Sequence, residues 1–183
     1  MITTEPGLPA AALREAADPA RFARLFVEHY SWVWRTLRRL GVHPGAVDDA
    51  AQQVFLATSQ RLQHVPPEKE RAFLMAVTVR TASNARRTQS RRREEPASDE
   101  EPMDEPGRSP EELLEWKQRR AKLDEWLSAL PLDLRVPFVL FELEGLTLVE
   151  ISELCKLPLG TIKTRLRRAR GIFLEATQDG GPQ

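Results

Sequence analysis

The sequence predicts an all-α protein built from two small helical domains joined by a flexible acidic linker. Three observations lead to this fold class. Apolar residues recur at helical spacing through most of the chain. Glycine is sparse, at 9 of 183 residues, and no stretch alternates apolar and polar residues for long enough to predict a strand. A chain of this length has room for one ordinary domain or two small ones.

The distribution of charge predicts where the linker lies. The chain is neutral overall, but residues 1–93 carry 15 basic and 8 acidic side chains, whereas residues 94–112 carry 1 and 9. An acidic, proline-rich segment without aromatic residues cannot bury enough apolar surface to offset the entropy of ordering. We therefore expect five parts: a flexible N-terminal tail (1–18), a helical domain (19–93), a disordered linker (94–108), a second helical domain (109–177) and a flexible C-terminal tail (178–183).

Three helices are predicted in the first domain. Apolar residues at helical period run through residues 22–40, and Gly41 with Pro44 marks the end of this helix. A second helix is expected over residues 47–62. A pair of prolines then predicts a loop, and a third helix follows over residues 68–92.

Two helices are predicted at the start of the second domain. Ser109 and Glu112 have the spacing of a capping box, with proline at the first helical position between them. The helix that they open is expected to end before Pro131. The next helix is expected over residues 132–144, where Pro137 is tolerated only if it lies in the first turn.

The last two helices have the pattern of a helix-turn-helix. Thr147 and Glu150 repeat the capping-box spacing and predict a short helix that ends near Cys155. A longer basic helix is expected over residues 160–176. A short helix, a tight turn and a longer basic helix are the parts of a DNA-binding helix-turn-helix.

The final helix has two unlike faces. One arc is apolar and is expected to pack inward: Leu159, Ile162, Leu166, Ala169 and Phe173. The opposite arc is basic and polar: Lys163, Thr164, Arg167, Arg168 and Arg170. Such a face can be merely solvated, but the second helix of a helix-turn-helix enters the major groove, where arginine and lysine reach guanine edges. We therefore expect this face to contact DNA.

A longer run of residues resembles a known family. Leu130-Pro131, Glu144-Gly145-Leu146-Thr147 and the stretch from Pro158 to Arg170 resemble region 4 of sigma-70-family factors, in particular those of the extracytoplasmic-function (ECF, group 4) class. In that family, region 4 reads the −35 promoter element. The resemblance implies that four residues of the last helix contact DNA: Lys163, Thr164, Arg167 and Arg168.

The first domain resembles the same family independently. The stretch from Val47 to Phe55 (VDDAAQQVF) is similar to region 2.2, which docks on the clamp helices of the RNA polymerase β′ subunit. The resemblance implies that four residues bind polymerase: Asp49, Gln52, Gln53 and Phe55. Phe55 shares a face with Ala51 and Thr58, so it has an alternative place in the core. For the other three residues the alternative is an ordinary solvated face.

The third helix resembles region 2.4, which binds and melts the −10 element. The resemblance implies four DNA-binding residues: Arg80, Asn84, Arg87 and Arg91. The family commonly has Trp, Tyr, Asn and Asp where this chain has Phe73, Met75, Arg80 and Asn84, so base preferences do not carry over. The loop over residues 63–71 matches the position where the family forms a pocket for a flipped-out base.

Several function classes are not indicated by the sequence. Its three histidines are scattered, and no catalytic motif, metal site or cofactor fingerprint is found, so we expect no enzyme and no cofactor. A single cysteine excludes an intramolecular disulfide. No apolar run approaches the roughly 18 residues of a membrane span, and no secretory signal is recognised. We expect a soluble protein of the bacterial cytoplasm.

The resemblance implies an alternative sigma factor that directs promoter-specific transcription initiation. Its expected partners are core RNA polymerase (the β′ clamp helices and the β subunit), promoter DNA and an anti-sigma factor. Two other interpretations stay open. One is a stand-alone helix-turn-helix regulator, and the other is a degenerate sigma-like protein that titrates an anti-sigma factor.

Overall fold

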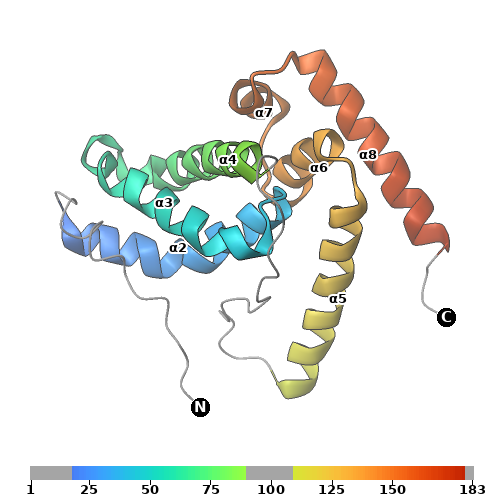
Figure 1. Cartoon of the computed structure of the whole chain (residues 1–183), viewed down its shortest axis with the longest axis horizontal. Coiled ribbons are helices and arrows are strands. Elements are labelled where there is room, and N and C mark those ends of the chain that lie inside the picture. The colour runs from blue at the N-terminus through green and yellow to red at the C-terminus, as the bar shows by residue number, and fades with distance from the viewer. Residues whose placement is uncertain (1–17, 90–108, 180–183) are drawn as a thin grey trace. The chain divides into compact units, whose positions relative to one another are not determined.

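All regular elements in the described part of the protein are helices. The computed structural model describes residues 18–89 and 109–179 (Figure 1), and these two ranges contain no strand, which confirms the all-α prediction. The chain divides into two compact units, Met1–Gly107 and Arg108–Gln183. Apart from Asp18, the predicted N-terminal tail and linker lie outside the described residues.

Over residues 18–89, the first unit has three long helices and three short 3₁₀ turns. In chain order these are α2 (Pro19–Arg39), η1 (Pro44–Ala46), α3 (Val47–Ser59), η2 (Leu62–His64), η3 (Pro67–Lys69) and α4 (Glu70–Gln89). Helix α2 begins three residues before the predicted start because the side chain of Asp18 accepts a hydrogen bond from the backbone N–H of Arg21. It ends as predicted, with Gly41 at φ 85°.

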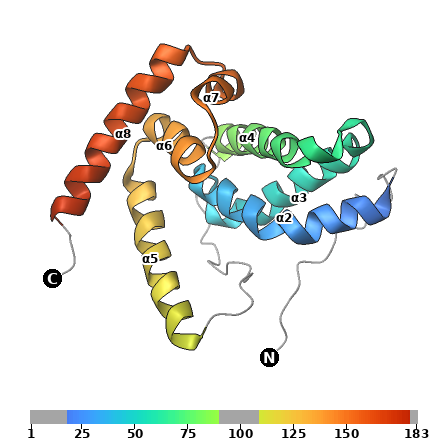
Figure 2. The same cartoon turned by 180° about the vertical axis from the view of Figure 1, so that it is seen from behind.

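An aromatic cluster fills the core of the first unit. The rings of Phe26 and Phe55 lie edge-to-face at 4.7 Å between centroids, and Phe22 and Tyr30 complete the cluster. Helix α3 packs against both α2 and α4 (Figure 2). Leu37, Val54 and Leu74, one from each long helix, are fully buried at this junction. These contacts fix which residues of α3 face outward.

The second unit holds the helix-turn-helix. Its elements are α5 (Pro110–Ala129), α6 (Leu132–Phe138), the π-helical segment η4 (Val139–Leu143), α7 (Leu148–Cys155) and α8 (Leu159–Asp179). Helix α8 packs along α6 and against α7. The predicted capping boxes at Ser109 and Thr147 are both confirmed. Helix α8 continues to Asp179, three residues beyond its predicted end.

The prediction for Pro137 was wrong. Pro137 is the sixth residue of α6 rather than part of its first turn, so it lacks the N–H that would bond to the carbonyl of Asp133. The predicted single helix is divided there. The chain continues in the wider π-helical turn of η4, where the N–H of Glu144 donates to the carbonyl of Val139 at 3.1 Å.

Each unit uses an arginine from a later helix to satisfy a helix end. Arg86 of α4 donates to the carbonyl of Leu40, just after α2, at 2.6 Å. Arg135 of α6 donates to the carbonyls of Ser128 and Leu130 at the end of α5, at 2.5 and 3.1 Å. The last carbonyls of a helix have no partner within it, and a positive charge there also suits the helix dipole. The guanidinium of Arg86 thus binds the end of α2.

Two glycines of the second unit make a matched test of backbone conformation. At both Gly145 and Gly171 an added Cβ would meet no atom within 4 Å, but only Gly145 has a positive φ, of 71°. Gly145→Ala should therefore destabilise the unit by about 1–2 kcal/mol through backbone strain alone. Gly171→Ala, inside α8, should stabilise it by about 0.5–1 kcal/mol. Urea unfolding followed by circular dichroism measures both, and shifts of the same sign would contradict this account.

Candidate nucleic-acid interface

The helix-turn-helix consists of α7, a tight turn and α8. The backbone N–H of Glu150 donates to Oγ1 of Thr147 at 3.3 Å, and the N–H of Thr147 donates to Oε2 of Glu150 at 2.8 Å. Hydrogen bonds from the Thr147 hydroxyl and backbone lower the pKa of the Glu150 carboxyl below its ordinary value. The carboxylate therefore stays charged at the N-terminus of α7, where the helix dipole favours it.

The turn between the two helices bends at Lys156, which has a left-handed conformation at φ 54° and ψ 44°. The N–H of Leu157 donates to the carbonyl of Ser152 at 3.1 Å, and Oγ of Ser152 donates to the carbonyl of Leu157 at 2.6 Å. These two hydrogen bonds close the turn and hold α8 in a fixed direction relative to α7. No local sequence pattern indicates that a lysine takes this conformation.

The buried side of α8 determines which residues face outward. Ile162, Leu166 and Ala169 are at most 4% exposed and pack into the second unit, as the apolar arc predicted. The prediction was wrong for Leu159, which is 36% exposed because it lies at the first residue of α8. The four residues predicted to contact DNA are all exposed on the other side: Lys163, Thr164, Arg167 and Arg168. The structure therefore brings these four together, although their contact with DNA stays a prediction.

Two arginines of α8 are held by acidic residues of the preceding elements. Nε of Arg165 lies 3.7 Å from a carboxylate oxygen of Asp133 in α6. Nε of Arg170 donates to a carboxylate oxygen of Glu142 in η4 at 2.5 Å, and its guanidinium lies over the ring of Phe141. Arg170 was expected on the basic face, but this ion pair offsets its charge.

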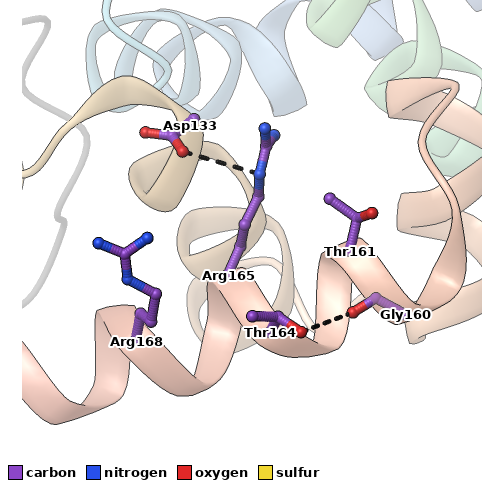
Figure 3. Close-up of a pocket in the computed structure, with 6 residues that line it drawn as sticks. All are labelled: Asp133, Gly160, Thr161, Thr164, Arg165 and Arg168. Carbon is purple, nitrogen blue, oxygen red and sulfur yellow. Dashed lines mark hydrogen bonds and ion pairs between the residues drawn. The ribbon is translucent and has the colours of Figure 1, made fainter.

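A hollow of about 420 Å³ lies over the first turns of α8 (Figure 3). Six residues line it: Asp133, Gly160, Thr161, Thr164, Arg165 and Arg168. The hydroxyl of Thr164 donates to the carbonyl of Gly160 at 3.0 Å, so in this conformation the hydroxyl oxygen is free to accept a hydrogen bond. The hollow thus presents both arginine donors and hydroxyl acceptors beside the exposed side of α8.

Helix α4 presents part of the surface predicted to bind the −10 element. Arg80, Asn84 and Arg87 are exposed, and Arg87 donates to Oγ of Ser83 at 3.2 Å. Their spacing of four and three residues places them along one side of the helix. Arg91 lies outside the described residues.

The loop between α3 and α4 is tied to α2 by a partly buried ion pair. Nε of Arg21 donates to Oε1 of Glu70 at 2.6 Å, and the same guanidinium donates to the carbonyl of Val65 at 2.6 Å. Arg24 adds a longer contact to Glu70 at 3.5 Å. This loop contains the segment predicted to capture a flipped base. Sequence analysis missed the tie, because residues 44 to 49 positions apart carry no local signal.

Helix α3 separates its predicted polymerase-binding residues into two groups. Asp49, Gln52 and Gln53 are exposed, and together they form a polar outer side of the helix. Phe55 is 0% exposed and packs among the aromatic rings. The expectation that the Phe55 side chain contacts polymerase is therefore corrected, because a fully buried ring offers no surface to a partner.

Asp48, which sequence analysis did not single out, anchors the first turn of α3 to α2. Its carboxylate oxygen Oδ1 accepts hydrogen bonds from Nε1 of Trp34 at 2.9 Å and from the hydroxyl of Tyr30 at 3.4 Å. Burial, and then the neighbouring Asp48 carboxylate, raise the pKa of Tyr30 to about 12. The phenol thus remains a neutral donor, and Asp49 beside this anchor is left facing solvent.

No group of three or more His, Cys, Asp and Glu side chains is placed to hold a metal ion in residues 18–89 and 109–179. Within the same two ranges, no helix has the length and apolar character needed to cross a membrane.

Both units match known protein families. Residues 25–92 match sigma-70 region 2, and residues 120–171 match sigma-70 region 4. The ECF RNA polymerase sigma-E factor of Escherichia coli K12 is 29% identical over 167 residues, which cover 85% of this chain and 86% of the relative. The ECF RNA polymerase sigma factor SigE of Mycolicibacterium smegmatis is 28% identical over 159 residues. That match covers 85% of this chain but only 61% of the mycobacterial protein.

A solved structure shares the fold. The structure of CnrH in complex with the cytosolic domain of CnrY matches with a TM-score of 0.59 and 21% identity, covering 94% of this chain and 97% of that one.

A helix-turn-helix with an exposed basic recognition helix, preceded by a separate helical unit, defines a DNA-binding protein of transcription. The chain belongs to the sigma-70 family and is a factor of its ECF class, whose members direct promoter-specific transcription initiation. The family is non-enzymatic, and this protein, as a member, is not an enzyme.

The exposed side of α8 gives the first test of DNA recognition. If Arg168 or Lys163 reads a base edge, its replacement by alanine should weaken binding to a selected promoter duplex by about 1–3 kcal/mol. Binding to a scrambled duplex should weaken less. Arg119→Ala removes the same charge from an exposed position on α5 and is the matched control. Fluorescence anisotropy measures the affinities, and equal losses on both duplexes would reassign the residue to a phosphate contact.

Proposed function

We propose that the two units divide promoter recognition between them. The unit with α8 reads the −35 element, and the unit with α4 binds and opens the −10 element. The exposed, clustered side of α8 formed by Lys163, Thr164, Arg167 and Arg168 carries the first part of this proposal. A helix held by its buried side, with donors along the opposite side, is suited to the major groove.

The unit with α4 supplies the second DNA contact. Arg80, Asn84 and Arg87 offer exposed donors to the DNA backbone, and Arg91 extends the same basic series in the sequence. The loop held by Arg21 is available to capture a flipped base, which lowers the cost of opening the duplex. Met75, one of the residues that depart from the family pattern, is only 5% exposed. The burial of Met75 supports a packing role rather than a base contact at that position.

Docking on core RNA polymerase is assigned to α3. Asp49, Gln52 and Gln53 would meet the β′ clamp helices. Phe55 holds the helix from the core, and Asp48 ties its first turn to α2. The acidic Asp49 faces solvent next to a carboxylate already engaged by Trp34, so its own charge is available to a basic partner. The β subunit is proposed as a further contact of the second unit.

An anti-sigma factor is proposed as a regulator, and the bacterial cytoplasm as the site of action. The support for such a partner is the fold shared with CnrH, which was solved in complex with the cytosolic domain of CnrY. Two alternatives are separated by experiment. A stand-alone regulator would bind duplex DNA but not core polymerase, and a degenerate sigma-like protein would bind its regulator but fail in run-off transcription.

The polymerase-docking proposal predicts a clear loss. Asp49→Ala combined with Gln52→Ala should abolish co-purification with core polymerase and run-off transcription, because it removes exposed polar contacts without disturbing the core. Circular dichroism should show unchanged helical content. The control, Glu125→Ala with Gln118→Ala, likewise removes one carboxylate and one amide, here from exposed positions of α5.

The control variant should retain polymerase binding. An unfolded double variant at Asp49 and Gln52 would mean that these side chains are structural. Retained binding by the folded variant would contradict docking through α3 and favour a stand-alone regulator.

A further inference from the structure

The basic residues of α8 fall into two groups, and two acidic residues outside the helix make the difference. Arg165 is paired with Asp133, and Arg170 with Glu142. Within the described residues, no ion pair is found for the other three: Lys163, Arg167 and Arg168. The recognition helix is therefore not uniformly positive, because α6 and η4 offset two of its charges.

Asp133 occupies a particular place among these groups. It lies in the first turn of α6 and is the one acidic residue among the six that line the hollow beside α8 (Figure 3). Thr161, Arg165 and Arg168 follow at spacings of four and three residues along one side of α8. The Arg165 side chain runs past Asp133 with its Nε facing the carboxylate, and the Arg168 side chain projects separately.

The pair is accessible to solvent and therefore accessible to DNA. The Asp133 side chain is 52% exposed and that of Arg165 is 29% exposed. A phosphate near the hollow would compete with the Asp133 carboxylate for the Arg165 guanidinium. The two groups lie 3.7 Å apart, well inside the Debye length of about 8 Å at physiological salt, so the carboxylate offsets the charge of Arg165 at the place where DNA would approach.

An additional phosphate contact would raise affinity for every DNA sequence equally. Phosphate contacts position a protein on the duplex but carry no direct sequence information. They supply essentially all of the non-specific affinity, which competes with promoter binding across a whole genome. A recognition helix with all its arginines free would therefore have a higher affinity for any DNA without a higher specificity for the promoter.

We infer that Asp133 is a positioning residue that holds Arg165 away from DNA phosphates and so limits the sequence-independent affinity of the recognition helix. The inference rests on the proposed reading of DNA by α8. Arg165, paired with Asp133, then makes no DNA contact. Arg168 and Thr164 are the residues of the hollow that face DNA.

Asp133→Asn tests this role in the full chain. The amide keeps the size of the side chain but removes the charge that holds Arg165. Binding to a scrambled duplex should then follow salt with a slope steeper by about 0.9, the value for one added phosphate contact. The affinity gain over wild type should be about threefold larger at about 50 mM salt than at about 200 mM. Glu125→Gln removes one carboxylate charge at an exposed position of α5, outside the hollow, and should leave the slope near that of wild type.

Arg165→Gln completes the cycle. Alone it should leave the salt slope at the wild-type value, because Arg165 makes no phosphate contact while Asp133 holds it. Combined with Asp133→Asn it should cancel the gain. A wild-type slope for Asp133→Asn, an equal effect of Glu125→Gln, or a gain that persists in the double variant would each overturn the inference. Circular dichroism checks that all variants are folded.

The same titrations keep this inference separate from the proposed function. A wild-type preference for a duplex selected from a randomised pool, over its scrambled version, tests promoter reading by α8. The change of salt slope on the scrambled duplex tests Asp133 and does not depend on that preference. Loss of the preference with the predicted slopes intact would remove promoter reading but leave the restraint of Arg165 in place.

Discussion

The burial of one side of α8 is the constraint on which the candidate DNA interface depends. Ile162, Leu166 and Ala169 pack into the second unit. Full burial of an isoleucine or leucine side chain stabilises a fold by about 1.5–3 kcal/mol. Because the helix rotates 100° per residue, placing these three inward also places Lys163, Arg167 and the residues beside them outward. Hydrophobic packing thus decides where the recognition charges lie.

In each unit, acidic side chains form ion pairs with particular arginines. Asp133 and Glu142 engage two of the arginines on α8, and Glu70 engages Arg21 in the first unit. The two pairs on α8 are more exposed than the Arg21–Glu70 pair and contribute little to stability, on the order of 0–1 kcal/mol each. The importance of the two pairs on α8 lies in orientation, because each decides whether an arginine is available to DNA or occupied within the protein.

The first unit applies the same division of labour to α3. Phe55 faces the aromatic core and is fully buried, whereas Asp49 and Gln52 face solvent. Asp48 stands between these roles: its carboxylate accepts hydrogen bonds from Trp34 and Tyr30 of α2, and so holds the first turn of α3 in place. A docking surface on a helix needs such internal support, because a helix of 13 residues is marginal in isolation.

The amino-acid sequence by itself determined the helical class, the order of the helices, both capping boxes and the outward side of α8, because these follow from local spacing along the chain. The sequence allowed Phe55 either a place in the core or a contact with polymerase, and packing against α2 buries it in the core. Tertiary structure alone decided that Arg86 binds the end of α2, that Arg165 and Arg170 are paired, and that Pro137 lies inside a helix continued by a π-turn. These arginine contacts join residues 28 to 46 positions apart, and only the packing of one helix on another brings such groups within reach.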